Sequence, residues 1–389
     1  MLPAAHSELR WEPLPAGARQ QKLDLLRGFA LFGVLMVNLL DFFRVSLFEQ
    51  IVHFHTHPGP LNYAVDFTVA ALLEFKALTL FSLTFGIGVA VQFERARNRG
   101  MLPELFLARR FLILLAFGLL HITLISNVDI LCLYAVCGLL LLPLLRLPAI
   151  VLAIAGLAAI CLPNAVSFGP MLPDEAGLST AASGALHAYR DGTFFSMIPF
   201  RWHETKTLIA PLLIGVAQRT LGLMLLGVAV WRAGIIRNPE LFRLPLLATG
   251  IVAGAVGAIN TAAHLLGLRV APALAFAGDS APLAFAYAAA LLAWRGPGPA
   301  SVAAAGRMAL SNYLTQTILF SFVFYGYGLG LFGRLAPAPV ALFGIAVYFA
   351  QLWLSVWWLR RYRFGPFEWL WRSLTYGRPQ PMTQPRSTV

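Results

Sequence analysis

The chain alternates long apolar runs with short connections that are polar and basic. A helix needs about 20 apolar residues to cross the hydrocarbon core of a bilayer. Ten runs approach or reach that length, at about 25–43, 76–93, 109–127, 129–145, 148–163, 208–231, 244–266, 276–294, 307–330 and 338–359. An extra apolar piece at 63–75 is expected to lie at the membrane interface before the second span. The pattern predicts an all-α fold, a polytopic transmembrane helix bundle of about ten spans.

Composition supports this fold class. Hydrophobic residues make up 59% of the chain, charged residues only 12%, and the mean hydropathy is +0.73. These values exclude a soluble globular protein. The net charge of +12 does not indicate nucleic-acid binding, because the basic residues recur in short groups between apolar runs. If both termini are cytoplasmic, 21 of the 29 Lys and Arg residues fall on the inner side, as the positive-inside rule requires.

These signals divide the chain into five parts. We expect a mobile cytoplasmic tail (1–22), an N-terminal membrane half with the first five spans (23–163) and an extracytoplasmic loop region (164–205). A C-terminal membrane half with the last five spans and an interfacial segment (206–378) follows, and then a disordered tail (379–389).

The first span carries a polar stripe into the membrane. At about 100° and 1.5 Å per residue, Asn38 lies within roughly 20° of the direction of Arg27 and about 16 Å further along the axis. Asp24 precedes Arg27 by three residues. Taken alone, Arg27 would be an arginine that snorkels to the membrane interface, and Asn38 would form a hydrogen bond between helices. Together they favour a polar site inside the bundle.

A second group follows the strongest basic segment, which contains Arg109 and Arg110 and is expected to be a loop. His121 comes eleven residues after Arg110, which places it beyond the bilayer middle, and Asp129 falls at the next outer turn. A neutral histidine bonded to a backbone carbonyl is one reading. The other is a proton-accepting base whose imidazole Asp129 orients.

Other polar residues have two readings each. Lys76 is an interface anchor or a cavity charge that pairs with Glu74 or Asp129. The glycines of Phe85-Gly86-Ile87-Gly88 indicate close helix packing rather than a nucleotide loop. His53, His55 and His57 favour a solvated loop over a metal site, and no metal is predicted.

The last two segments complete the set of candidate residues. Around Tyr313, two polar rows run along the penultimate span, and a helix that lines a cavity explains them better than inter-helix hydrogen bonds alone. After the last span, Glu368 and Arg372 belong to an aromatic and basic segment. An interface belt is the favoured reading, and its rival is a lid that grips the phosphate of a lipid headgroup or a coenzyme. The rows contain Arg307, Ser311 and Thr315, and Asn312 and Gln316.

Five motifs in order resemble the YeiB family of bacterial inner-membrane proteins, over about residues 20–378. They are Asp24-x-x-Arg-Gly-x-Ala-x-x-Gly-Val-x-x-x-Asn38, Lys76-x-x-Thr-Leu-Phe-Ser-Leu-x-Phe-Gly-x-Gly88, His121 with Asp129-Ile-Leu, Gly306-Arg-Met-Ala-Leu-Ser-Asn-Tyr-x-x-Gln316 and Phe364-Gly-Pro-x-Glu-Trp-Leu-Trp-Arg372. Asn127-Val-Asp129 departs from the family, which usually has Gly before the Asp. The resemblance implies a multi-pass protein of the bacterial inner (cytoplasmic) membrane.

The YeiB family is in turn distantly similar to membrane acyltransferases such as heparan-α-glucosaminide N-acetyltransferase. The shared element is Arg27, ten residues, and a polar residue at the place of Asn38. The resemblance implies transfer of an acetyl or other acyl group from a coenzyme A thioester to a sugar, lipid or small-molecule acceptor. His121 would then be the general base, Asp129 its orienter, and Asn38 a donor to the oxyanion.

In this hypothesis Arg27, Arg109 and Arg110 grip the coenzyme phosphates. The expected partners are membrane lipids and the acceptor, without nucleic acid, and a homodimer is compatible with the sequence. The alternative is a proton-coupled transporter or a lipid or solute flippase that uses the same polar cavity. A third option, a structural or sensory subunit, requires no reactive His121.

Overall fold

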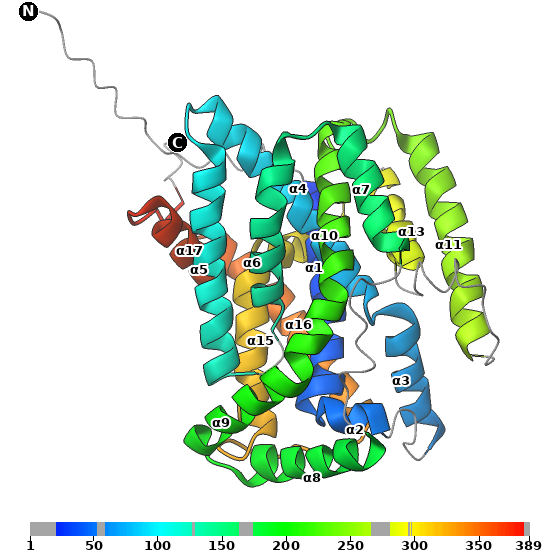
Figure 1. The fold of residues 1–389 in the computed structure, drawn as a ribbon, viewed down its shortest axis with the longest axis vertical. Helices are drawn as coiled ribbons and strands as arrows, with labels where there is room; N and C mark the ends of the chain where they lie inside the picture. The colour runs from blue at the N-terminus through cyan, green and yellow to red at the C-terminus, as the bar shows by residue number, and fades with distance from the viewer. Residues whose placement is uncertain are drawn as a thin grey trace, which may run out of the picture.

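The computed structural model describes residues 21–52, 59–126, 129–162, 174–265, 281–294, 296 and 298–384, and almost all of these are helical. Figure 1 shows the helices as an upright bundle. In its first half the elements are α1 (Gln21–Val37), the π-helix η2 (Asn38–Phe43), α2 (Leu47–Val52), α3 (Pro60–Leu72), α4 (Lys76–Asn98), α5 (Pro103–Leu124), α6 (Ile130–Leu141), the 3₁₀ helix η3 (Leu142–Arg146) and α7 (Ala149–Cys161). The second half contains α8 (Glu175–Asp191), α9 (Phe194–Glu204), the π-helix η5 (Thr205–Ile209), α10 (Ala210–Arg232), α11 (Arg243–Leu265), α13 (Ala281–Ala293), α14 (Ala300–Arg307), α15 (Ala309–Phe324), α16 (Pro337–Leu359) and α17 (Pro366–Tyr376).

The helical membrane bundle is confirmed. In the described part of the chain, six helical segments are long and apolar enough to cross a membrane. Shorter apolar helices lie at Ile130–Arg146, Ala149–Cys161 and Ala281–Ala293. Each of the ten expected spans overlaps a described helix. The expected division near Lys76 is present too, because the chain turns between α3 and α4 and Phe75 adopts a left-handed conformation there.

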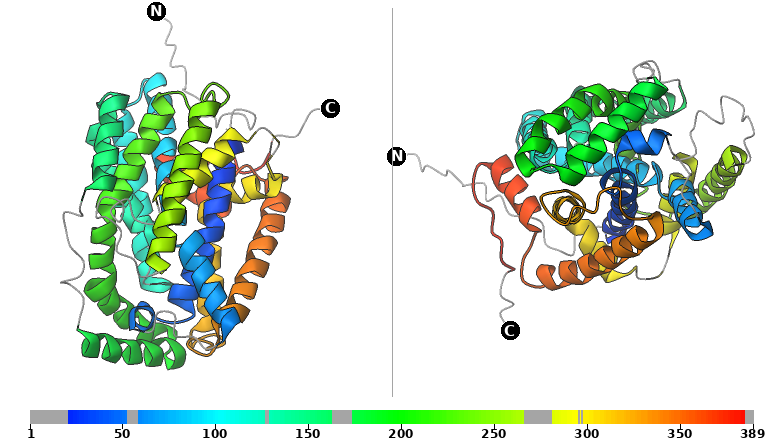
Figure 2. Two further views of the ribbon diagram at one scale, coloured as in Figure 1. Left: turned by 90° about the vertical axis from the view of Figure 1, so that its right-hand side faces the viewer. Right: turned by 90° about the horizontal axis from the view of Figure 1, so that it is seen from below.

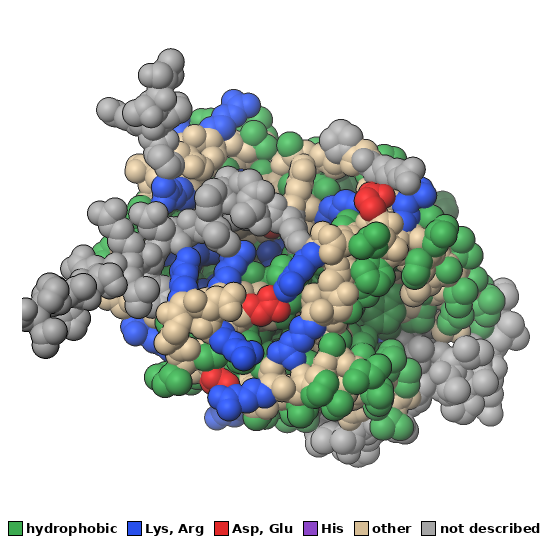
Figure 3. All heavy atoms as spheres, turned by 90° about the horizontal axis from the view of Figure 1, so that it is seen from above, with side chains coloured by type: hydrophobic (Ala, Val, Ile, Leu, Met, Phe, Trp, Pro, Cys, Tyr) green, Lys and Arg blue, Asp and Glu red, His purple; other side chains and the backbone are tan. Residues whose placement is uncertain are grey.

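One end of the bundle collects the basic residues, and we call it the arginine-rich end. Arg237 after α10 is paired with Glu94 near the end of α4, at 2.6 Å. Arg146 is paired with Glu104 in the first turn of α5, at 2.7 Å. Figure 3 shows Lys and Arg side chains gathered over this face. Helices α8 and α9 lie across the opposite end (Figures 1 and 2).

Helix α1 lies at the centre of the bundle and contacts α4, α14, α15 and α16. The approach of α14 is close because Gly28 and Gly306 face the partner backbone, and a Cβ on either would collide with it. Gly86 of α4 faces the backbone of Met224 on α10 in the same way. The expected packing role of Gly86 therefore agrees with the structure. Small residues at helix contacts are the usual means of close approach in membranes.

Two expectations about loops were wrong. Arg109 and Arg110 do not belong to a loop, because α5 begins at Pro103 and both arginines are helical. The segment 164–205 is not one polar loop either. It contains α8 and α9, and α9 continues through η5 into α10 without a break. The capping box of Thr193 and Ser196 starts α9.

Two further boundaries differ from the expectation. The penultimate span is broken at Met308, where α14 ends and α15 begins, so Arg307 is not on the same continuous helix as Ser311. The tail after residue 378 is ordered as far as Gln384, which donates its backbone N–H to the carbonyl of Arg361. Residues 1–20 and 385–389, which belong to the two expected tails, lie outside the described residues.

Candidate functional site

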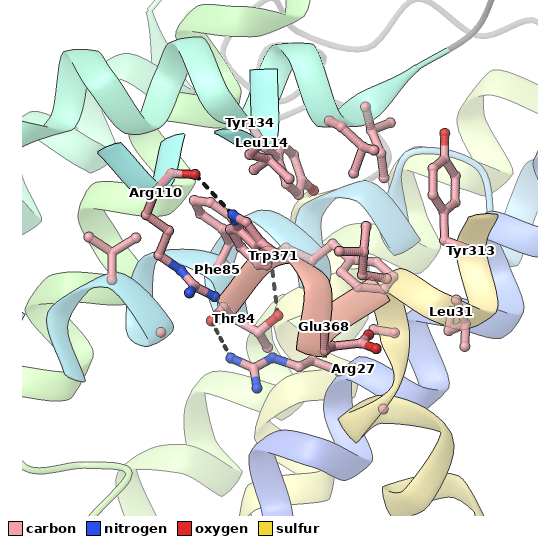
Figure 4. A pocket seen from close by; sticks show the side chains of 18 of the residues that line it. Arg27, Leu31, Thr84, Phe85, Arg110, Leu114, Tyr134, Tyr313, Glu368 and Trp371 are labelled. Carbon is pink, nitrogen blue, oxygen red and sulfur yellow. Dashed lines mark hydrogen bonds between the residues drawn. The ribbon is translucent and has the colours of Figure 1, made fainter. Parts of the chain in front are cut away.

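A cavity of about 240 Å³ opens among α1, α4, α5, α6, α14, α15 and α17. We call it the arginine cavity, because four arginines from four different helices line it. They are Arg27 of α1, Arg110 of α5, Arg307 of α14 and Arg372 of α17. Figure 4 shows Arg27, Arg110 and Glu368 around the cavity, with Tyr313 far from Arg110. Of the polar stripe predicted on α1, Arg27 lines this cavity, whereas Asp24 and Asn38 do not.

The side chain of Arg27 passes close to α4 at Gly88, which has no side chain. Its Nη2 atom lies 3.3 Å from the carbonyl oxygen of Thr84, and Nη1 lies 3.6 Å from Asp24. A Cβ atom on Gly88 would be 3.0 Å from Nη2. Gly88 thus makes room for the guanidinium, which differs from the purely packing role expected for the Phe85–Gly88 segment.

Arg110 lies over an aromatic ring. Its guanidinium carbon lies 3.5 Å from the centroid of the Trp371 ring. The indole N–H of Trp371 donates to the backbone carbonyl of Arg110 at 2.9 Å. A cation over an indole face is favourable, and the hydrogen bond fixes the ring. The pair also fastens α17 to α5.

Glu368 joins α17 to the start of α15. Its carboxylate accepts hydrogen bonds from the backbone N–H of Ser311, at 3.0 Å, and from the Ser311 hydroxyl. A carboxylate at a helix N-terminus is favourable, because the first N–H groups have no intrahelical partner. Burial raises the pKa of Glu368 and lowers the pKa of Arg372, whose guanidinium lies over the Phe364 ring.

The His121 cluster lies beyond the cavity. Nδ1 of His121 is 3.2 Å from Oδ1 of Asp129, and Nε2 is 2.9 Å from the hydroxyl of Thr317. The other carboxylate oxygen of Asp129 accepts the backbone N–H of Cys132 and caps α6. His121 is 2% exposed and Asp129 is fully buried. The sequence could not show that these two residues touch, and the structure brings them together.

The cavity and the cluster occupy successive levels of the same helices. Arg27 and Arg110 both line the cavity, and Asn38 and His121 each follow eleven residues later. Eleven helical residues span about 16 Å and return to nearly the same face. Asn38 and His121 therefore each lie about 16 Å along their own helix from the arginine that lines the cavity. Tyr313 connects the levels, since it lines the cavity and its ring centroid is 5.4 Å from that of His121.

Comparison with known proteins identifies the family. The chain is 32% identical over 405 residues to a Bacillus subtilis protein named "Uncharacterized protein YxaH", covering 96% of this chain and 98% of that protein. It is 29% identical over 391 residues to Escherichia coli "Uncharacterized protein YeiB", covering 92% and 96%. The chain belongs to the YeiB family. The family model described as a protein of unknown function, DUF418, matches residues 236–378. No solved structure matches the chain.

The arginine cavity of this YeiB-family protein crosses the boundary of the DUF418 match. Arg307, Glu368 and Arg372 lie inside the matched residues, whereas Arg27 and Arg110 lie before them. The cavity therefore requires both parts of the chain.

Several expected site residues do not line this cavity. Asn312 donates to the carbonyl of Ala305 and to Ser355, and Gln316 donates to Gln351 at 2.7 Å. These bonds hold α15 against α14 and α16, so Asn312 and Gln316 act in inter-helix contacts, while the helix itself does line the cavity through Leu310 and Tyr313.

Lys76 and Arg109 are also outside the cavity. Lys76 donates to the carbonyl of Ala70 at the corner between α3 and α4. Arg109 donates to the carbonyl of Leu374 on α17, at 2.8 Å. Arg109 and Arg110 thus separate, because neighbouring helical residues point about 100° apart. Asn38, His121 and Asp129 do not line the cavity either.

Some site residues escaped the sequence analysis. Tyr134, Trp371 and Gln92 line the cavity, but tyrosine and tryptophan near a membrane boundary are too common to mark a site. Gly118 packs against the carboxylate of Asp129. The only sequence signal for this contact was that Gly118 lies three residues before His121. His53, His55 and His57 lie outside the described residues. Among the residues described, no group of three His, Cys, Asp or Glu side chains is placed to hold a metal ion.

A second buried polar cluster lies toward the opposite end. Tyr189 of α8 donates to the carboxylate of Glu204 on α9. Arg201, which is fully buried, donates to the carbonyl of Thr123 in the last turn of α5, at 3.0 Å. A cation at a helix C-terminus offsets the free carbonyls there. This contact fixes the turn two residues after His121.

Proposed function

We propose that this protein is an acyltransferase of the bacterial cytoplasmic membrane. It would transfer an acetyl or other acyl group from a coenzyme A thioester to a hydroxyl or amine of a sugar, lipid or small molecule. One observation carries the proposal, namely the buried contact of His121 with Asp129 and Thr317. A histidine beside a carboxylate, in a site without bulk water, is the arrangement of a general base.

The roles follow from the two ring nitrogens. A proton on Nδ1, the nitrogen that faces Asp129, would leave Nε2 as the proton acceptor, and Nε2 faces the Thr317 hydroxyl. The Thr317 hydroxyl, 2.9 Å from Nε2, marks where the hydroxyl of an acceptor would deliver its proton. The acceptor oxygen would attack the thioester carbon, the carbon–sulfur bond would break, and the imidazolium would return the proton to the leaving thiolate. Asn38 would stabilise the oxyanion.

The test uses the full-length protein in lipid nanodiscs, with radiolabelled acetyl-coenzyme A and a panel of hydroxyl and amine acceptors. We expect acyl product, or slow release of free thiol, and a loss of about 100-fold or more in His121→Ala, because a general base contributes 10²–10⁴-fold. His187→Ala is the matched control, since His187 lies exposed on α8 and 3.3 Å from Asp191. Acyl transfer would be rejected if the folded protein formed no acyl product and released no thiol.

The same assay separates the alternative. If folded protein makes no product, but proteoliposomes take up a solute in response to a pH gradient and lose that uptake in His121→Ala, the buried pair is a proton relay of a transporter. Unchanged phenotypes of His121→Ala and Asn38→Ala would favour a structural subunit.

A further inference from the structure

We propose that the arginine cavity is a binding site for a phosphate group. The group belongs either to a phosphorylated small molecule or to the headgroup of an anionic phospholipid, and both present the same chemistry to the protein. This inference stands apart from acyl transfer, because a transporter of a phosphorylated solute would need the same cavity.

The charges that line the cavity do not balance. Arg27, Arg110, Arg307 and Arg372 provide four guanidinium groups, and Glu368 is the one carboxylate among the lining residues. Asp24, which does not line the cavity, is paired with Arg27 at 3.6 Å, so two carboxylates stand against four arginines. Glu368 is engaged with the N–H and the hydroxyl of Ser311. The positive charges of Arg372 and Arg27 also repel that of Arg110. A cavity of this kind attracts an anion.

Arg110 is the clearest unsatisfied group. It is only 7% exposed, and its Nε atom has no hydrogen-bond partner. Its guanidinium carbon lies 3.5 Å from the centroid of the Trp371 ring, and this contact holds the charged group at the cavity wall. Arg110 and Arg372 form no ion pair with any carboxylate in the described part of the chain. A buried cation without a counter-charge is costly, and a bound anion would remove that cost.

The arrangement suits phosphate better than a single carboxylate. A phosphate monoester carries up to two charges and three terminal oxygens, so it can accept from guanidinium groups that approach from several directions. Arginine is the residue whose planar fork matches such oxygens. Here the guanidinium groups come from α1, α5, α14 and α17, which surround the cavity. Two charges on the ligand offset more of the excess than one would.

The aromatic part of the wall would hold the rest of the ligand. Phe85 and Tyr134 lie with their ring centroids 5.2 Å apart, and both line the cavity beside Trp371. Apolar walls with a few placed polar groups are the usual form of a small-molecule site. The volume of about 240 Å³ suits a phosphate with a small attached group.

The experiment measures equilibrium binding by calorimetry to the full-length protein in nanodiscs of zwitterionic lipid. The probes are inorganic pyrophosphate and glycerol 3-phosphate. We expect saturable binding that weakens at least about tenfold in Arg110→Gln and in Arg372→Gln, as expected for hydrogen bonds to charged groups. Arg110→Lys keeps the positive charge but loses the planar guanidinium, so its affinity for the probes should lie between that of the wild type and that of Arg110→Gln. Arg146→Gln, a surface arginine paired with Glu104, is the matched control and should bind like the wild type.

A second arm distinguishes the source of the phosphate. Nanodiscs with anionic phospholipid should abolish pyrophosphate binding if the natural ligand is a headgroup, and should leave it unchanged if the ligand is a free phosphorylated molecule. The inference is overturned if neither probe binds in either nanodisc and no anionic lipid co-purifies in an Arg110-dependent manner. Equal binding by folded Arg110→Gln, Arg372→Gln and Arg146→Gln overturns it too. Arginine-dependent binding without acyl product would retain the site and reject only acyl transfer.

Discussion

The carboxylate of Asp129 occupies space on α5 that only a glycine leaves free. A Cβ atom on Gly118 would lie 2.7 Å from Oδ2 of Asp129 and 2.8 Å from the backbone nitrogen of Cys132. The same carboxylate faces His121 and caps α6. The glycine three residues before the histidine therefore sets how closely Asp129 can approach the imidazole.

Gly118→Ala should move Asp129 away from His121 and loosen the start of α6. We expect a loss of about 1–3 kcal/mol in stability, the usual cost of overpacking, and a loss of any activity that needs the pair. Thermal unfolding in detergent measures the first effect. Gly254→Ala is the control, because its new methyl group would meet Ala286 at 3.6 Å, an ordinary contact. Equal melting temperatures for the two variants would contradict the close approach at Gly118.

Ser311→Ala should release α17 from the bundle. The Ser311 hydroxyl donates to Glu368 and accepts the backbone N–H of Phe367 at 3.0 Å, so its loss leaves partly buried groups without partners. Such a loss costs about 1–3 kcal/mol. Limited proteolysis after Tyr362 or Arg363 should accelerate severalfold. In Ser321→Ala, which loses only a local bond to the carbonyl of Ile318, the cleavage rate should stay at the wild-type value.

The pKa of Glu368 predicts how pH affects stability. Burial raises this pKa, so the folded protein binds the proton more readily than the unfolded chain does. The contribution of Glu368 to folding free energy therefore becomes more favourable as pH falls through the raised pKa, and is lost as pH rises. The gain in melting temperature between pH 8 and pH 5 should be larger for the wild type than for Glu368→Gln. An identical gain would show that folding does not raise the pKa of Glu368.

The sequence specified the helices better than the site. Hydropathy marks each helix because a span must be apolar along its length, and that signal is local. The site depends on rotation and on contacts far apart in the chain. Arg109 and Arg110 looked like one basic pair, yet the helix start at Pro103 turns one toward Leu374 and the other into the cavity. Proline at the first helical position was a usable signal for that start.

The same limit explains the rows on α15. Asn312 and Gln316 bond to α14 and α16, whereas Tyr313, one residue away, faces the cavity. Polar spacing reveals that a face is not lipid-exposed, but it does not distinguish a cavity from a neighbouring helix. The contact of His121 with Asp129 was a reasonable hypothesis because both residues flank one short turn. The second partner of His121, Thr317, is 196 positions away in the sequence, so its contact could not be predicted.

Arg201 should be needed for stability rather than for ligand binding at the arginine-rich end. It is fully buried, donates to the carbonyl of Thr123 and offsets the charge of Glu204. Arg201→Gln removes the hydrogen bond to Thr123 and this favourable charge interaction, and the loss of a hydrogen bond from a charged group costs about 1.5–3 kcal/mol. Adding Glu204→Gln should recover part of the loss, because the uncompensated charge is then removed as well. Chemical unfolding of both variants measures the difference, and additive losses would show that the two residues act independently. Binding of pyrophosphate to folded Arg201→Gln should match the wild type, since Arg201 does not line the arginine cavity.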